Sequence, residues 1–131
     1  MTLPFKKISI VGLGLIGTSI LHAINANKDE VITYAYDINK KHRDLVLGMK
    51  IASFVCNDIN DAIKDVDLVI LAVPVGSMKS LAISIASSLK ESAIVTDTGS
   101  TKSSVINDVK PYLPASINFI PSHPLAGTEY S

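Results

Sequence analysis

The chain has 131 residues, of which 47% are hydrophobic and 18% charged, so it can bury a core as one globular domain. Twelve basic residues balance twelve acidic ones, which excludes the strongly basic surface expected for binding nucleic acid or an anionic membrane. The single cysteine, Cys56, excludes an internal disulfide and indicates a reducing compartment, and the histidines lack the spacing of a zinc site, so we expect no metal.

Lys6 and Lys7 precede an uncharged stretch, residues 8–26, which superficially matches a signal peptide. Three glycines and a polar end, from Thr18 to Asn25, are unlike a signal sequence or a membrane helix. We therefore expect a cytoplasmic protein.

Short apolar segments alternate along the chain with segments of helical spacing. The pattern predicts strands over 7–12, 31–37, 54–56, 67–74, 93–97 and 117–121. It predicts helices over 15–26, 40–50, 60–65, 78–90 and 101–110. This alternation favours an α/β fold with a doubly wound parallel sheet of about six strands and helices on both faces, a Rossmann-type dinucleotide-binding domain over residues 1–131.

The unusual residues share one position, because each directly follows a predicted strand. These residues are Gly12, Asp37, Pro74, Thr98 to Ser100, and Ser122 with His123. The C-terminal ends of parallel strands meet at one edge of the sheet, where open α/β sheets bind ligands. We therefore expect five loops to converge on one crevice.

The first loop reads Gly12-Leu13-Gly14-Leu15-Ile16-Gly17, between a predicted strand and a predicted helix. In that setting Gly12 permits a tight turn, Gly14 lets the backbone approach a pyrophosphate, and Gly17 lets the helix pack against the strand. The helix N-terminus offers free N–H groups to the phosphates. We predict that this whole segment contacts a dinucleotide cofactor.

Asp37 ends the second predicted strand, twenty residues after Gly17. A carboxylate there can accept hydrogen bonds from both hydroxyls of the adenosine ribose and would repel a 2′-phosphate, which favours NAD over NADP. Lys40 and Lys41 argue in the other direction, because they could partly neutralise a phosphate.

Two further loops contribute candidate residues. Val73 and Pro74 are expected to form a wall beside the cofactor, although Pro74 could simply end the strand. Thr98 and Gly99 are expected near the cofactor, and Ser100 or Thr101 could cap the next helix or act in the site. Lys102 stands where the helix dipole disfavours a cation, so it either faces an anionic ligand or is a solvated lysine.

His123 lies between Pro121 and Pro124 in the last loop. Its ordinary pKa of about 6.5 suits proton transfer near neutral pH, so we predict that it is a catalytic base. His22 and His42 lie on predicted helices and are interpreted as structural.

Four segments together resemble the prephenate dehydrogenase family, which includes arogenate and cyclohexadienyl dehydrogenases. They are GLGLIGTS (12–19), DLVILAVPV (67–75), TDTGSTK (96–102) and SHPLAGTE (122–129). The resemblance covers essentially the whole chain, as the N-terminal nucleotide-binding domain of that family.

The resemblance implies NAD-dependent oxidative decarboxylation of prephenate to 4-hydroxyphenylpyruvate, in tyrosine biosynthesis. It implies that His123 accepts the proton of the substrate's ring hydroxyl and that Ser100 orients this hydroxyl and the nicotinamide. It also implies that Thr128 and Glu129 lie at the mouth of the substrate site, and the position of Lys102 in the first turn of its helix makes it a further candidate for a substrate contact.

The family continues into a helical domain that forms a homodimer and supplies an arginine for a substrate carboxylate. We therefore expect this chain to bind NAD and to turn over prephenate poorly or not at all. Three alternatives remain: an arogenate dehydrogenase, a β-hydroxyacid-type dehydrogenase, which also begins with GLG, and a non-catalytic nucleotide-binding module.

Overall fold

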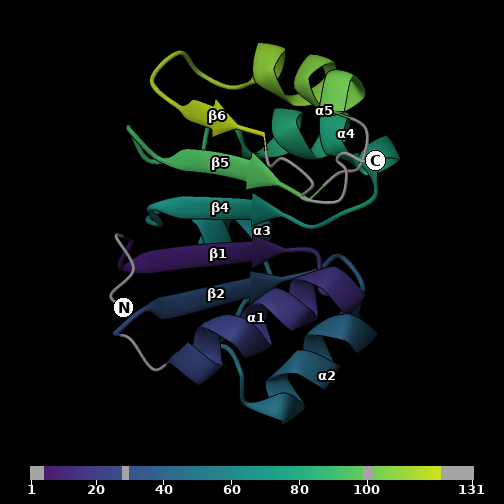
Figure 1. Cartoon of the computed structure of the whole chain (residues 1–131), viewed down its shortest axis with the longest axis vertical. Coiled ribbons are helices and arrows are strands. Elements are labelled where there is room, and N and C mark those ends of the chain that lie inside the picture. Colours follow the sequence, from purple (N-terminus) through teal and green to yellow (C-terminus); the bar gives the residue numbers. More distant parts are fainter. Residues whose placement is uncertain (1–4, 28–29, 99–101, 122–131) are drawn as a thin grey trace.

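The computed structural model describes residues 5–27, 30–98 and 102–121, which form one parallel sheet with helices on both faces (Figure 1). The strands are β1 (Lys7–Val11), β2 (Ile32–Tyr36), β3 (Phe54–Val55), β4 (Leu68–Leu71), β5 (Ile94–Asp97) and β6 (Asn118–Ile120). The helices are α1 (Leu15–Asn27), α2 (Lys40–Met49), α3 (Ile59–Ile63), α4 (Val75–Ile85), α5 (Lys102–Val109) and the 3-10 turn η1 (Lys110–Tyr112).

The strand order in the sheet is β3-β2-β1-β4-β5-β6, and every neighbouring pair is parallel. The chain first runs outward from β1 to β3 and then returns to the middle to place β4 beside β1 (Figure 1). The order therefore reverses between β1 and β4, which confirms the predicted doubly wound fold.

Two hydrophobic cores lie on opposite faces of the sheet. One contains Ile10 of β1 with Leu21 of α1 and Val46 of α2, and the other contains Leu71 of β4 with Met78 of α4. Figure 1 shows α1 and α2 on the near face and α3 behind the sheet. Because β4 is covered on both faces, its sequence is apolar without alternation.

Some boundaries differ from those that the sequence predicts. β4 ends at Leu71, and α4 begins at Val75 instead of residue 78 and ends at Ile85 instead of residue 90. Pro74 directly precedes this helix, and its φ of −57° is close to the helical value. The first two residues of the helix, Val75 and Gly76, have low helix propensity, so the sequence does not indicate that the helix starts there. α5 changes to a 3-10 turn at Lys110, because Pro111 cannot continue an α-helix.

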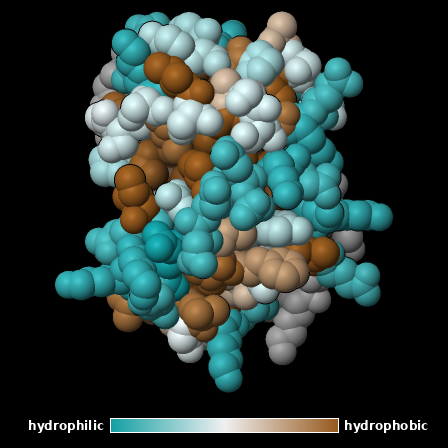
Figure 2. Space-filling model, turned by 180° about the vertical axis from the view of Figure 1, so that it is seen from behind, coloured by the Kyte–Doolittle hydropathy of each residue, from teal (hydrophilic) through white to brown (hydrophobic). Residues whose placement is uncertain are grey.

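No helix in the described parts of the chain is both long and apolar enough to cross a membrane. Figure 2 shows the face opposite to that of Figure 1, where hydrophilic residues cover much of the surface and hydrophobic residues show between them. A mixed surface of this kind is usual for a folded domain, because polar groups cannot cover it completely.

Candidate functional site

A cavity of about 740 Å³ lies at the C-terminal edge of the sheet, where the strand order reverses. Its walls include the loop after β1, the end of β2, the loop after β4 and one face of α4. Five of the predicted site residues line it: Gly12, Gly14, Asp37, Val73 and Pro74. Both its size and its position are those of a small-molecule site in an open α/β sheet.

Gly12 and Gly17 are required by the fold itself. Gly12 has φ +104°, and a Cβ there would overlap the carbonyl oxygen of Ala72 after β4. A Cβ on Gly17 would overlap the carbonyl oxygen of Gly12. These glycines let the loop, the first turn of α1 and the end of β4 approach one another closely.

Gly14 has a different environment, because a Cβ there would meet no atom within 4 Å in the part of the chain that the structure describes. Packing among the described residues therefore does not require a glycine at this position, although Gly14 lines the cavity. α1 starts at the next residue, and its first N–H groups have no acceptor within the helix. An anionic group beside Gly14 could approach this backbone without a steric obstacle and would face the positive end of the helix dipole.

Leu13, Leu15 and Ile16 do not line the cavity in this structure. The Leu13 side chain is buried in the core beneath α1 and α2. Its backbone N–H instead donates a hydrogen bond to Asp37. Leu15 and Ile16 are exposed at the start of α1. The predicted contacts of these three side chains with a cofactor remain predictions.

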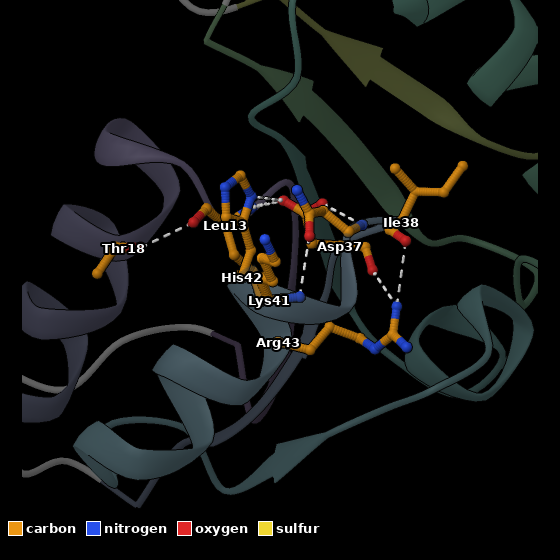
Figure 3. Close-up of polar contacts among 8 residues, drawn as sticks. Leu13, Thr18, Asp37, Ile38, Lys41, His42 and Arg43 are labelled. Carbon is orange, nitrogen blue, oxygen red and sulfur yellow. Dashed lines mark hydrogen bonds and ion pairs between the residues drawn. The ribbon is translucent and has the colours of Figure 1, made fainter.

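The carboxylate of Asp37 is held by three donors of the chain (Figure 3). Oδ1 accepts from the backbone N–H of Asn39 at 2.7 Å. Oδ2 accepts from the N–H of Leu13 at 2.7 Å and lies 3.1 Å from Nδ1 of His42. Burial raises the pKa of the Asp37 carboxyl, but these hydrogen bonds together outweigh it, so the pKa lies below its ordinary value. Asp37 is therefore an anion at neutral pH.

The turn that carries Asp37 is fixed by the start of α2. The side chain of Asn39 caps this helix by accepting a hydrogen bond from the N–H of Lys41 at 2.9 Å. Arg43 donates to the carbonyl oxygens of Asp37, at 2.8 Å, and Ile38, at 3.3 Å (Figure 3). Its guanidinium also lies over the ring of Tyr36. The carboxylate is thus held in a fixed position at the cavity.

The sequence interpretation missed several residues of the cavity wall. α4 contributes Ser77, Ser80, Leu81 and Ser84, and the opposite side includes Ile38, Asn39, His42 and Ile59. The spacing of the serines over three and seven residues places them on one helix face, which is a signal that the sequence does contain. His42, interpreted as structural, lies on a helix as expected, but its ring faces the cavity beside Asp37.

Thr98 follows β5 and is not part of the cavity wall. Its N–H and its hydroxyl both point to the carbonyl oxygen of Leu71, at 3.1 and 3.4 Å, so it connects the ends of β5 and β4. Several predicted site residues lie outside the described residues: Gly99, Ser100, Thr101, His123, Thr128, Glu129 and the side chain of Lys102. Within the described ranges, no group of three or more His, Cys, Asp or Glu side chains is placed to hold a metal ion.

Comparison with known proteins identifies the family of the chain. The family described as "Prephenate dehydrogenase, nucleotide-binding domain" matches residues 20–131. A cyclohexadienyl dehydrogenase of Zymomonas mobilis is 45% identical over 125 residues, which are 95% of this chain and 42% of that protein. A prephenate dehydrogenase of Bacillus subtilis is 30% identical over 125 residues, 95% of this chain and 34% of that protein.

Among solved structures, prephenate dehydrogenase from A. aeolicus, in complex with hydroxyphenyl propionate and NAD+, has a TM-score of 0.83 and 29% sequence identity. The similarity covers 98% of this chain and 45% of that one. This chain therefore spans less than half the length of each of these relatives. The family match covers most of the chain and confirms the resemblance seen in the sequence motifs: the chain belongs to the prephenate dehydrogenase family, as its nucleotide-binding domain.

Proposed function

We propose that the chain is the NAD-binding part of a dehydrogenase that converts prephenate to 4-hydroxyphenylpyruvate on the route to tyrosine. One observation carries the proposal: a glycine position open to a ligand and an anionic carboxylate line the same cavity. The first suits a pyrophosphate and the second suits a ribose. Family membership and the NAD+ named in the A. aeolicus complex support the same assignment.

The residues of the cavity fit the parts of NAD. Gly14 and the N-terminus of α1 would hold the pyrophosphate, because a phosphate can approach the backbone there. Asp37 would accept a hydrogen bond from the adenosine ribose, and Val73 with Pro74 would form the wall beside it. When bound, NAD supplies the acceptor for a hydride from the ring carbon that bears the substrate's hydroxyl.

The reaction also requires a base and groups that orient the substrate. We assign the base to His123, which takes the proton of the ring hydroxyl, and the orientation of this hydroxyl to Ser100. Lys102, Thr128 and Glu129 are assigned to substrate contacts. Carbon dioxide leaves as the ring becomes aromatic. These assignments rest on the sequence alone: on its motifs, and for Lys102 on its position in the first turn of a helix.

Cofactor binding is tested by titrating the chain with NAD and with NADP in a calorimeter. We expect tighter binding of NAD, because the Asp37 carboxylate repels a 2′-phosphate. Tighter binding of NADP would contradict the assignment of Asp37, and the absence of binding by either nucleotide would contradict the proposed function.

Turnover is tested by following NADH formation from prephenate. We propose that residues beyond this chain complete the substrate site and form a homodimer, so the 131-residue chain alone should produce little NADH. Sustained turnover by this chain would contradict that proposal. In a longer protein that contains the chain and is active, His123→Asn should lower kcat by about 10²–10⁴-fold. His22→Asn should leave kcat unchanged.

Arogenate is a second candidate substrate. The 45% identical relative is named a cyclohexadienyl dehydrogenase, whereas the relatives named prephenate dehydrogenases are 30% and 33% identical. Comparing kcat/KM for prephenate and arogenate in the longer protein distinguishes the two. The single cysteine and the biosynthetic reaction support a cytoplasmic location.

A further inference from the structure

His42 contacts the carboxylate that we assign to the adenosine ribose. Its ring points toward the Asp37 carboxylate (Figure 3), with Nδ1 3.1 Å from Oδ2. The ring also lines the cavity. The side chain of His42 is 42% exposed, whereas that of Asp37 is only 12% exposed. The imidazole therefore covers one side of a carboxylate that has little other access to solvent.

The hydrogen bonds of Asp37 leave it with limited capacity for a ligand. A carboxylate offers about four lone-pair positions. The N–H of Asn39 occupies one on Oδ1, and the N–H of Leu13 and the His42 ring occupy two on Oδ2. The sequence predicts that Asp37 accepts both ribose hydroxyls. In this arrangement Oδ1 can accept one hydroxyl, and a second must displace His42 from Oδ2.

Two of the neighbouring cations on α2, Lys40 and Arg43, have other partners. Nζ of Lys40 lies 2.8 Å from the carboxylate of Asp44, and Arg43 donates to backbone carbonyl oxygens. The Lys41 side chain is exposed. Among the described residues, His42 is thus the titratable side chain of α2 that touches the Asp37 carboxylate.

We propose that His42 is a specificity-determining residue that reduces the preference of the site for NAD over NADP. This inference rests on the proposed function, since it requires Asp37 to face the adenosine ribose. The ring competes with a ribose hydroxyl of NAD for Oδ2. The same ring also donates to the carboxylate and so weakens its repulsion of the 2′-phosphate of NADP. Both effects lower the ratio of the two dissociation constants, Kd(NADP)/Kd(NAD).

The test is calorimetric titration of the 131-residue chain and its His42→Ala variant with NAD and NADP, at one pH and one salt concentration. Losing one hydrogen bond to the carboxylate should raise Kd(NADP)/Kd(NAD) by about fivefold to tenfold. A purely structural role of His42 would weaken the binding of both nucleotides alike and leave this ratio unchanged.

Two further variants test the cause of the change. His42→Asn keeps an amide donor near the position of Nδ1, so the ratio should rise less than in His42→Ala. In the Asp37→Asn background, His42→Ala should leave the ratio unchanged, because the carboxylate on which it acts is gone. His22→Ala, at an exposed histidine of α1, is the matched control and should have no effect.

The outcomes separate the inference from the proposed function. If the parent chain binds NAD and His42→Ala leaves the ratio unchanged or lowers it, the inference is wrong and the proposed function stands. An Asn variant that matches the Ala variant would exclude the hydrogen bond as the cause and would overturn the inference as well. If the parent chain binds neither nucleotide, both fail.

Discussion

The backbone N–H of Leu13 donates a 2.7 Å hydrogen bond to Oδ2 of Asp37, twenty-four residues further along the chain. This bond joins the glycine loop after β1 to the end of β2, so one carboxylate both holds the loop and faces the cavity. A change at Asp37 should therefore affect the position of the loop as well as the contact with a ribose.

Replacing Asp37 by asparagine should weaken NAD binding and reduce the preference for NAD over NADP. The variant keeps the size of the side chain but loses the charge that strengthens the bond to Leu13 and repels a 2′-phosphate. We expect Kd for NAD to rise by about tenfold to one hundredfold, the loss of one charged hydrogen bond. Asp44→Asn removes an exposed carboxylate of α2 and is the control, with little change in either Kd.

Gly14→Ala should abolish or strongly weaken nucleotide binding without destabilising the fold. The new methyl group would meet no atom of the described residues within 4 Å, but it would enter the space that we assign to the pyrophosphate. The unfolding midpoint in urea should stay at the parent value or rise, while Kd for NAD rises. Gly48→Ala, in α2 and equally free of neighbours, should keep the parent Kd. Unchanged NAD binding by Gly14→Ala would place the pyrophosphate elsewhere.

Gly17→Ala, unlike Gly14→Ala, should destabilise the folded chain. Its Cβ would overlap the carbonyl oxygen of Gly12, and backbone cannot move aside as a flexible side chain can. We expect a loss of about 2–4 kcal/mol in the free energy of unfolding, measured by urea denaturation. In the Gly76→Ala variant of α4, the new Cβ would meet none of the described residues within 4 Å, so the urea midpoint should be unchanged or slightly raised. Equal stability of the two variants would be inconsistent with this packing.

Asp67 should make the free energy of unfolding depend on pH in the acid range. Its carboxylate accepts hydrogen bonds from Nζ of Lys90 and from the backbone N–H groups of Lys6 and Lys7. The bond from Lys90 is the largest cause of a pKa below the ordinary value, and the two backbone bonds add to it against the effect of burial. Because the folded pKa is lowered, the stabilisation is complete above the unfolded pKa, about 3.9, and is lost as pH falls through the folded value.

Asp67→Asn should therefore be less stable than the parent chain at neutral pH, and the difference should shrink as the pH falls below about 4. Urea midpoints measured across this range would show it. Asp65→Asn is the control, because Asp65 is exposed and makes a surface pair with Lys7, so its midpoint should barely change. A difference that persists undiminished in acid would mean that the charge of Asp67 is not the cause.

The sequence is sufficient to predict the fold and the five cavity residues that follow strands. Apolar strands such as β4 are recognisable because both of their faces are buried, and the edge at which they end is fixed by parallel pairing. The glycine loop is recognisable because Gly12 and Gly17 are required at that spacing for close packing.

The partners of Asp37 could not be predicted in the same way. The contact with His42 depends on the turn before α2 that Arg43 and Asn39 fix. Helical periodicity indicates which face of α2 is buried, but it does not specify a side-chain contact across that turn. Leu13 shows the same limit, because its side chain packs into the core while its N–H contacts Asp37. A motif places a residue in a loop, but it does not say which of its atoms faces the ligand.

The reversal of strand order has a kinetic consequence. β1, α1, β2, α2 and β3 form one half of the sheet, the strands from β4 to β6 form the other, and in the sheet they meet only where β1 pairs with β4. Pairs so distant in sequence are expected to form late in folding. The cavity is lined from both halves, so a ligand gains its full set of contacts only after they have joined. A bound ligand should therefore slow unfolding while leaving the rate of folding almost unchanged.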